Sequence, residues 1–178
     1  MEDSKHVFVT VGTTQFAALV NAVLAPSMLA QLAEHGYTHL TVQAGALACA
    51  IKAPPMTPPQ LVIDVYDYKP SLGPDLARAQ LVISHAGAGC LLEALRAPEE
   101  KSHQHGRRVV AVINETLLDN HQAELARVLH ADGYLVSSVA GELGDAVEAA
   151  HTVPLRPFPA QDTSRFPLAL REAVWHGL

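Results

Sequence analysis

Cysteine, aromatic residues and charge are all scarce in this chain of 178 residues. Its two cysteines, Cys49 and Cys90, lie in apolar or glycine-rich stretches without the spacing of paired ligands, which argues against a disulfide framework or zinc site and for a reducing compartment. Charged residues make up 17%, the formal net charge is −6, and no Lys/Arg cluster is present, so nucleic acid is not an expected partner. Hydrophobic residues still make up 49%, enough for the core of one domain.

A long hydrophobic run is also missing. The longest apolar stretch, residues 16–24, is interrupted by Asn21 and is far shorter than the roughly 18 residues that a membrane span needs. The polar N-terminus leads directly into a predicted strand, which leaves no room for the apolar core of a secretory signal. We therefore expect a cytoplasmic protein without a direct membrane span.

The chain does contain an alternating pattern of short β-branched runs and helical stretches. The pattern predicts strands at 6–11, 39–43, 61–66, 81–84, 108–113 and 134–136, and helices at 16–35, 71–79, 87–96, 120–130 and 141–150. Such alternation is typical of a single Rossmann-like, doubly wound parallel sheet of the α/β class. Ser71 is an expected helix cap, and Gly133 an expected helix stop.

One strand-to-helix corner has the composition of a phosphate-binding site. The strand ending at Ser84 runs into His85, Ala86, Gly87, Ala88 and Gly89, which open the next helix. Glycines let backbone approach a ligand, and the positive end of the helix dipole favours an anion. The signal is weak alone, because the glycines also suit tight packing. Leu92 occupies the position of the third glycine of a dinucleotide fingerprint, which disfavours a nicotinamide cofactor.

Two neighbouring corners carry polar side chains that suit sugar hydroxyls. Taken singly, these residues also fit helix caps or an exposed first turn. Because the carboxyl ends of parallel strands meet at one edge of a sheet, we predict that they share a crevice with the first corner. The residues are Gly12, Thr13 and Thr14 after the first strand, Asn114 at the end of the fifth, and Asp119, Asn120, His121 and Gln122 at the next helix start.

Five segments between residues 7 and 135 together resemble one known family. They are FVTVGTT at 8–14, GYTHL at 36–40, YKPSL at 68–72, VISHAGAG at 82–89 and DNHQAELA at 119–126. The family is the cytosolic catalytic subunit of the heterodimeric UDP-N-acetylglucosamine transferase of dolichol-linked oligosaccharide synthesis, itself related to the bacterial lipid-linked peptidoglycan transferase. The resemblance implies the C-terminal, donor-binding half of a GT-B glycosyltransferase.

The resemblance also implies roles for particular residues. It makes residues 1–155 a UDP-sugar-binding domain and 156–178 a tail and helix that dock on a partner. The diphosphate would contact the 86–89 backbone and His85, which would act catalytically on the departing UDP. Glu93 would bind the ribose, and Asp119 and Gln122 the sugar. Tyr68 and Lys69 would surround the uracil.

The implied reaction is an inverting transfer of GlcNAc from UDP-GlcNAc to dolichyl-diphosphate-GlcNAc. It uses no cofactor and no metal, and the sequence has no Asp-x-Asp pair. The acceptor would bind a membrane-anchored glycosyltransferase subunit, because a domain of this size is not expected to leave space for an acceptor-binding half, and that subunit would recruit the chain to the cytosolic face of the endoplasmic reticulum. No residue is identified as the general base.

Some features leave alternatives open. The stretch 97–106 is an insertion relative to the family pattern. Phe166, Leu170, Val174 and Leu178 form one face of an amphipathic helix, which packs either on this domain or on another subunit. A non-catalytic UDP-sugar-binding or scaffold subunit would share every motif, whereas an epimerase would need both halves in one chain.

Overall fold

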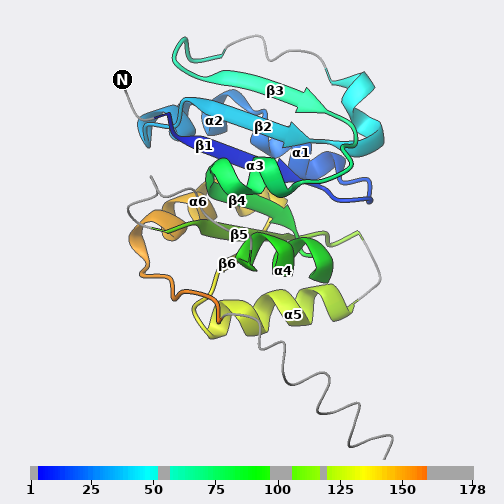
Figure 1. Cartoon of the computed structure of the whole chain (residues 1–178), viewed down its shortest axis with the longest axis vertical. Coiled ribbons are helices and arrows are strands. Elements are labelled where there is room, and N and C mark those ends of the chain that lie inside the picture. Colours follow the sequence, from blue (N-terminus) through cyan, green and yellow to red (C-terminus); the bar gives the residue numbers. More distant parts are fainter. Residues whose placement is uncertain (1–3, 52–56, 97–105, 117–119, 160–178) are drawn as a thin grey trace, which may run out of the picture.

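The computed structural model describes residues 4–51, 57–96, 106–116 and 120–159, without the side chains of 120–122. The predicted helix at 165–178 and most of the insertion at 97–106 lie outside the described residues. The described residues form one layered α/β unit around a central sheet (Figure 1).

All six strands of the sheet are parallel, in the order β3-β2-β1-β4-β5-β6. Their bounds are β1 His6–Thr10, β2 His39–Gln43, β3 Val62–Tyr66, β4 Ala79–His85, β5 Arg108–Ile113 and β6 Val136–Val139. The order runs outward from β1 in one direction and from β4 in the other, as in doubly wound sheets. The predicted fold class is therefore confirmed, and its switch point lies between β1 and β4.

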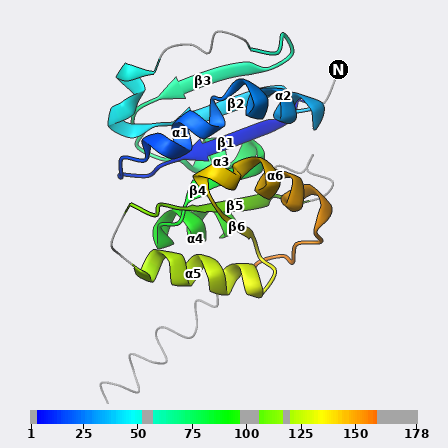
Figure 2. The same cartoon turned by 180° about the vertical axis from the view of Figure 1, so that it is seen from behind.

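Helices cover both faces of this sheet. Figure 1 shows α3, α4 and α5 in front, and Figure 2 shows α1, α2 and α6 on the other side. The bounds are α1 Ala17–Val23, α2 Pro26–Glu34, α3 Gly73–Arg78, α4 Ala88–Arg96, α5 Asn120–Ala131 and α6 Leu143–Thr152, with 3₁₀ turns at Gly45–Ala50 and Ala140–Glu142. Because right-handed crossovers in opposite directions place helices on opposite faces, the reversal at β1 and β4 produces both layers.

The two faces of β1 feed two separate cores. Val7 and Val9 join the core under α1, α2 and α6, whereas Phe8 joins the one under α3, α4 and α5. This alternation is the period of two that a strand requires. At the carboxyl ends of the central strands the buried residues become polar, with Thr10, Gln43, Ser84 and His85 each at most 6% exposed.

Several element boundaries differ from the sequence prediction. The single helix predicted at 16–35 is two helices, because Pro26 cannot continue the first one and instead occupies the first turn of α2. β4 starts at Ala79, so α3 is shorter than predicted. The N-cap of α3 is Leu72 and not the predicted Ser71, although the Ser71 hydroxyl accepts a hydrogen bond from the Gly73 N–H (3.1 Å). Gly133 ends α5 with a φ of 78°.

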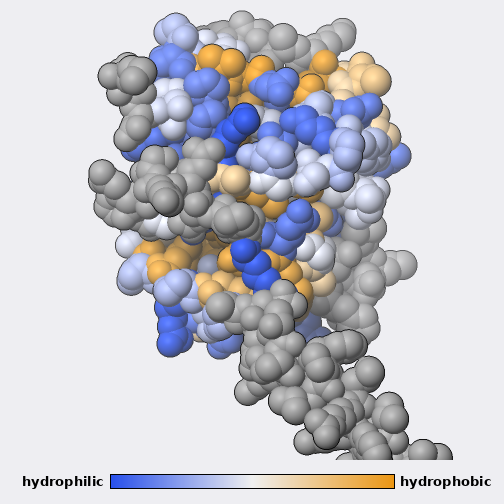
Figure 3. Space-filling model, viewed as in Figure 1, coloured by the Kyte–Doolittle hydropathy of each residue, from blue (hydrophilic) through white to orange (hydrophobic). Residues whose placement is uncertain are grey.

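The front of the sheet is not evenly covered. Figure 3 shows hydrophobic side chains at the surface over β3, where Figure 1 shows no described helix in front of the strand. Val62, on this edge strand, is 58% exposed. Helices cover the central strands of the sheet instead, and the buried polar residues lie there.

Candidate functional site

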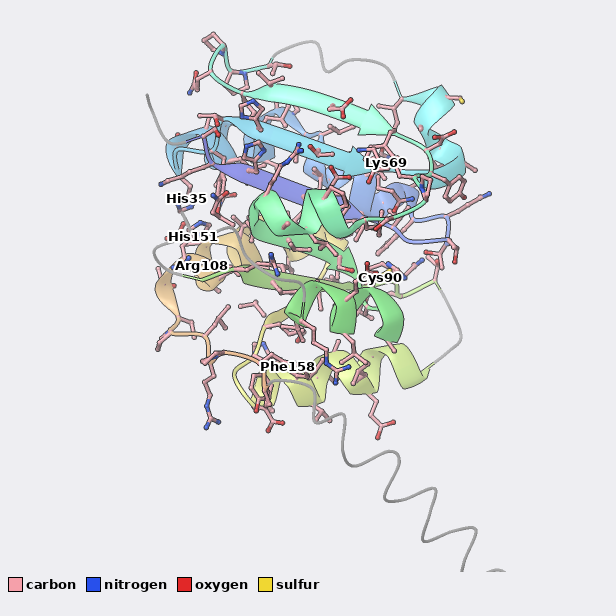
Figure 4. The ribbon with its side chains drawn as sticks, in the orientation of Figure 1. His35, Lys69, Cys90, Arg108, His151 and Phe158 are labelled. Carbon is pink, nitrogen blue, oxygen red and sulfur yellow. The ribbon has the colours of Figure 1, made fainter. Side chains whose placement is uncertain are left out.

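A cavity of about 360 Å³ opens at the carboxyl ends of the central strands, where the strand order reverses. Open α/β sheets bind ligands at such a switch point. Figure 4 shows two of its residues, Lys69 and Cys90, toward the end at which the strand arrows point. This central cavity is lined by Gly12, Thr13, Gln43, Tyr68, Lys69, Leu72, His85, Gly87, Ala88, Gly89 and Cys90.

The imidazole of His85 fills a slot between two glycines at the base of the cavity. A Cβ on Gly12 would lie 2.5 Å from Cε1 of the ring, and a Cβ on Gly87 would overlap Nε2. His85 is 6% exposed, and its Nδ1 is buried without a hydrogen-bond partner among the described residues. Burial lowers the pKa of His85, against a weaker opposing effect of the Thr10 backbone. The ring is therefore neutral at pH 7.

The N-terminus of α4 adds N–H donors without an intrahelical acceptor to the cavity wall. The first intrahelical bond runs from the Leu91 N–H to the Gly87 carbonyl (3.0 Å). The N–H groups of Ala88, Gly89 and Cys90 come before it and have no acceptor within the helix. A Cβ on Gly89 would meet nothing within 4 Å. Close approach to a ligand therefore suits Gly89, whereas Gly87 is glycine because His85 packs against it.

The prediction that the Ala86 backbone binds substrate needs correction. Its N–H donates to the Val112 carbonyl (3.0 Å), which continues the ladder between β4 and β5. Ala86 is 1% exposed and does not line the cavity. Sequence alone does not distinguish the backbone N–H groups of this glycine-rich corner, but the one of Ala86 is hydrogen-bonded within the sheet and is not free for a ligand.

Gln43, which sequence reasoning missed, holds two walls of the cavity together. Its Oε1 accepts hydrogen bonds from the Thr10 hydroxyl (2.6 Å) and the Gly12 N–H (2.9 Å). Its Nε2 donates to the carbonyls of Gly12 and Asp67, both at 2.9 Å. The amide is 2% exposed and uses both ends. It therefore fixes the turn at Gly12, whose φ is 61°, against the segment that follows β3.

That segment brings an aromatic ring and a cation to the cavity. Tyr68 is 53% exposed, and its hydroxyl would lie 3.0 Å from a Cβ on Gly45. The Lys69 ammonium lies 3.0 Å from the Asp75 carboxylate and 3.8 Å from the centre of the Tyr66 ring. Both predicted residues therefore lie beside the Gly87–Gly89 corner, as the shared lining shows.

Other predicted residues lie away from the lining. The Thr14 hydroxyl donates to the Val11 carbonyl (2.8 Å), and Asn114 accepts from the backbone and hydroxyl of Thr116. Glu93 is exposed on α4 and does not line the cavity, although its charge reaches Cys90. Asp119 and the side chains of 120–122 lie outside the described residues.

Leu72 and Cys90 also line the cavity without having been predicted. Burial, followed by the charge of Glu93, raises the pKa of the Cys90 thiol, so it is protonated at pH 7. Leu72 is partly buried and packs against the front core. Their one signal in the sequence was proximity to predicted corners, and a rule that includes every residue flanking such a corner would have found both.

A second cavity, of about 420 Å³, lies at the other end of β5 and includes three arginines. Their guanidinium groups bind helix and strand carbonyls: Arg107 binds those of Leu76, Ala79 and Ala94, Arg108 binds that of Ala150, and Arg156 binds that of Asp132. These arginines therefore cap the ends of structural elements.

The described residues contain neither a candidate metal site nor a single membrane-spanning helix. No group of three His, Cys, Asp or Glu side chains there is arranged to hold a metal ion. No single described helix is long and apolar enough to cross a membrane; α1 and α2 meet the length and composition test only as a pair bent by 55°.

Known proteins share both sequence and fold with this chain. The model of the glycosyltransferase family 28 C-terminal domain matches residues 6–172. The UDP-N-acetylglucosamine transferase subunit ALG13 of Homo sapiens is 45% identical over 131 residues, which cover 74% of this chain and 11% of the human protein. The chain thus spans about a tenth of the length of that relative.

Two solved structures share the fold. The solution NMR structure of ALG13 superposes with a TM-score of 0.69 at 24% identity, over 97% of this chain and 98% of that one. MurG of Acinetobacter baumannii superposes with a TM-score of 0.67 at 16% identity, over 97% of this chain and 50% of MurG. The chain is a homologue of the ALG13 subunits and belongs to the glycosyltransferase family 28 C-terminal domain family.

Proposed function

We propose that this chain is the donor-binding subunit of a glycosyltransferase that transfers GlcNAc from UDP-GlcNAc to dolichyl-diphosphate-GlcNAc with inversion. The observation that carries the proposal is the central cavity at the switch point. There the N–H groups at the start of α4, which have no acceptor within the helix, share one lining with the enclosed imidazole of His85 and the Lys69 side chain. The name of the human relative, a UDP-N-acetylglucosamine transferase subunit, supports the choice of donor.

In this proposal the donor diphosphate lies against the N-terminus of α4. The N–H groups of Ala88, Gly89 and Cys90 are oriented before the ligand arrives, so they stabilise the charge on departing UDP without reorganising. His85, being neutral, contributes a hydrogen bond rather than a charge. Thr13 and Tyr68 contact the donor at the rim, and Glu93, Asn114 and 119–122 remain proposed contacts for the ribose and sugar. No metal ion or cofactor takes part.

The acceptor half is proposed to come from a membrane-anchored subunit at the cytosolic face of the endoplasmic reticulum. The relatives are named as subunits, which implies a partner. The superposition on half of MurG supports the same division. The tail at 156–178 is the proposed docking segment. A non-catalytic UDP-sugar-binding subunit is the alternative, because it would need the same cavity.

Gly89→Ala tests whether the donor diphosphate of the transfer reaction lies against the N-terminus of α4, which a subunit that only serves as a scaffold would not require. A Cβ at this position meets nothing within 4 Å, so the fold should persist, but the new methyl group would occupy the proposed path of the diphosphate. In a reconstituted transfer assay with the membrane subunit we expect kcat/KM for UDP-GlcNAc to fall by about 10- to 100-fold.

Gly141→Ala is the matched control. Gly141 also has open space around its Cβ position and no positive φ, and it lies on the 3₁₀ turn before α6. We expect wild-type turnover from this variant. Wild-type turnover from Gly89→Ala as well would favour the scaffold alternative.

A further inference from the structure

Lys69 is the one side chain with a formal charge at pH 7 among the described residues of the central cavity. The remaining lining is made of glycine, alanine, hydroxyl, amide, thiol, aliphatic and neutral imidazole groups. Each phosphate of a diphosphate carries negative charge, whereas a helix N-terminus supplies only about half of an elementary charge. The proposed donor therefore requires a further cation, since uncompensated charge in a partly enclosed site is costly.

In this structure the ammonium of Lys69 is held by two neighbours. It lies 3.0 Å from the Asp75 carboxylate and 3.8 Å from the centre of the Tyr66 ring. The Lys69 side chain is 39% exposed and that of Asp75 is 12% exposed. An ion pair open to solvent contributes little net stability. Its geometry keeps the charge beside the cavity without fixing it there strongly.

Asp75 stays paired if the ammonium moves away. The Tyr66 hydroxyl donates to the same carboxylate oxygen at 2.8 Å. Asp75 also lies in the first turn of α3, where the N–H groups of a helix favour negative charge. Releasing Lys69 therefore leaves no bare carboxylate, and the side chain is free to serve a ligand.

We propose that Lys69 is the phosphate-binding cation of the central cavity, and that its ammonium turns from Asp75 to the donor diphosphate when the donor binds. The proposal rests on the proposed function and gives this side chain a target different from uracil. During transfer the same ammonium stabilises the charge that accumulates on departing UDP. Tyr68 remains the proposed contact of the base.

The test compares UDP with uridine, which lacks the diphosphate. Both ligands are titrated by calorimetry into the wild-type chain of 178 residues and into Lys69→Met, which keeps an apolar stem and loses the charge. We expect UDP affinity to fall by about 10- to 100-fold, because one charge-assisted hydrogen bond is lost. Uridine affinity should stay within about twofold of wild type, which is well below the effect of one such bond.

Two further variants complete the design. Lys69→Arg keeps the charge and should retain most of the preference for UDP over uridine. Lys5→Met removes the same type of side chain from the segment before β1, at the opposite end of the sheet, and should bind both ligands like wild type. Thermal unfolding of each variant verifies that it folds.

Three outcomes would overturn the proposal. Equal loss of UDP and uridine affinity in Lys69→Met would mean that Lys69 supports the nucleoside site. Unchanged affinity for both ligands would mean that the ammonium stays on Asp75. If the wild-type chain binds neither ligand, the proposed function fails first, and the role of Lys69 fails with it.

Discussion

At the scale of single residues, Gln43 shows how a buried amide can organise a binding site. One side chain binds both the N–H and the carbonyl of Gly12 and also reaches the carbonyl of Asp67. These partners belong to the corner after β1 and the segment after β3, which form two walls of the central cavity. Because both ends of the amide are used, its orientation is fixed.

Replacing Gln43 should damage the cavity and the fold together. In Gln43→Leu the carbonyls of Gly12 and Asp67 lose their buried donor, so we expect the free energy of unfolding to fall by about 2–4 kcal/mol. We also expect the KM for UDP-GlcNAc to rise about tenfold, since the loss of one buried hydrogen bond has that effect on an equilibrium. Denaturant unfolding and initial-rate kinetics measure the two effects.

Gln31→Leu is the control for a purely structural loss. Gln31 donates one hydrogen bond to the Gly144 carbonyl at 2.9 Å, between α2 and α6, and does not line the cavity. It should lower stability while leaving KM unchanged. If Gln43→Leu behaved in the same way, Gln43 would have no role in positioning the donor site.

The positions of Gly12 and His85 could be anticipated from sequence because each follows a predicted strand end, whereas Lys69 was expected only from the family resemblance. Gln43 follows the same rule, but its importance depends on partners 31 and 24 residues away. The sequence also does not reveal which backbone N–H groups can bind a ligand. The Ala86 N–H donates to β5, whereas the N–H groups of Ala88 and Gly89 do not. Tertiary pairing of this kind leaves no local pattern.

At the scale of elements, α6 is fastened to the rest of the domain by a cluster of ionisable groups opposite the central cavity. His151 stacks on His35 with ring centroids 3.9 Å apart. Its ring nitrogens lie 2.9 Å from the Tyr37 hydroxyl and 2.7 Å from the Val147 carbonyl. Figure 4 shows His35, His151 and Arg108 together at this end. A carbonyl can only accept, so Nδ1 of His151 donates to Val147 and Nε2 accepts from the Tyr37 hydroxyl. These two hydrogen bonds are those of a neutral imidazole.

This cluster should make stability depend on pH. Burial, and then the charges of His35 and Arg108, lower the pKa of His151, against the Val147 carbonyl and Glu148. The unfolded chain, with an ordinary pKa of 6.5, therefore binds the proton first. The stabilisation is complete above that pH and is lost as pH falls toward the lower folded pKa. His85 contributes with the same sign.

The histidine at 151 can be tested by His151→Phe, which keeps an aromatic ring and removes the titration. From pH 7.5 to 5.5 we expect the free energy of unfolding of this variant to fall less than that of wild type, by roughly half a kcal/mol, because partial exposure screens the charges. Denaturant unfolding at several pH values measures the difference. If the free energy of unfolding of the two proteins changed equally with pH, groups other than His151 would cause the pH dependence.

Element type was easier to predict than element ends. The first five strands were predicted in the right places because each is a short β-branched run, whereas the sixth, predicted at 134–136, is β6 at Val136–Val139 and shares only Val136 with the prediction. The split between α1 and α2 was missed although Pro26 was visible, because apolar residues continue on both sides of it. β4 extends to His85 by pairing with β5, and that pairing is not encoded in the strand alone.

At the scale of the whole molecule, the described residues form one sheet with one polar switch point, and the central cavity lies there with Thr13 and Tyr68 exposed at its rim. A ligand can therefore bind from one side while its reacting end remains accessible. In the proposed function the acceptor arrives from that side on another polypeptide. Donor binding and transfer should then be separable properties.

The chain alone should bind UDP-GlcNAc but transfer it slowly. Adding the membrane subunit should raise the rate of labelled product formation at least about 100-fold, because alignment of two reactants supplies much of the rate. Extraction of lipid-linked product measures transfer, and calorimetry on the same preparation measures binding. Full turnover by the chain alone, on a lipid-diphosphate-GlcNAc acceptor, would contradict the division of labour.

The slot that holds the His85 ring has a consequence for how this domain changes over evolution. Gly12 is required twice, by the ring and by its φ of 61°, whereas Gly87 has no positive φ and is required by the ring alone. Residues in contact tend to covary. In diverging relatives, a side chain at position 87 should accompany the loss of histidine at 85, while glycine at 12 persists. The two glycines look equivalent in sequence, yet they are under different structural constraints. We therefore expect position 87 to vary among relatives that position 12 does not distinguish.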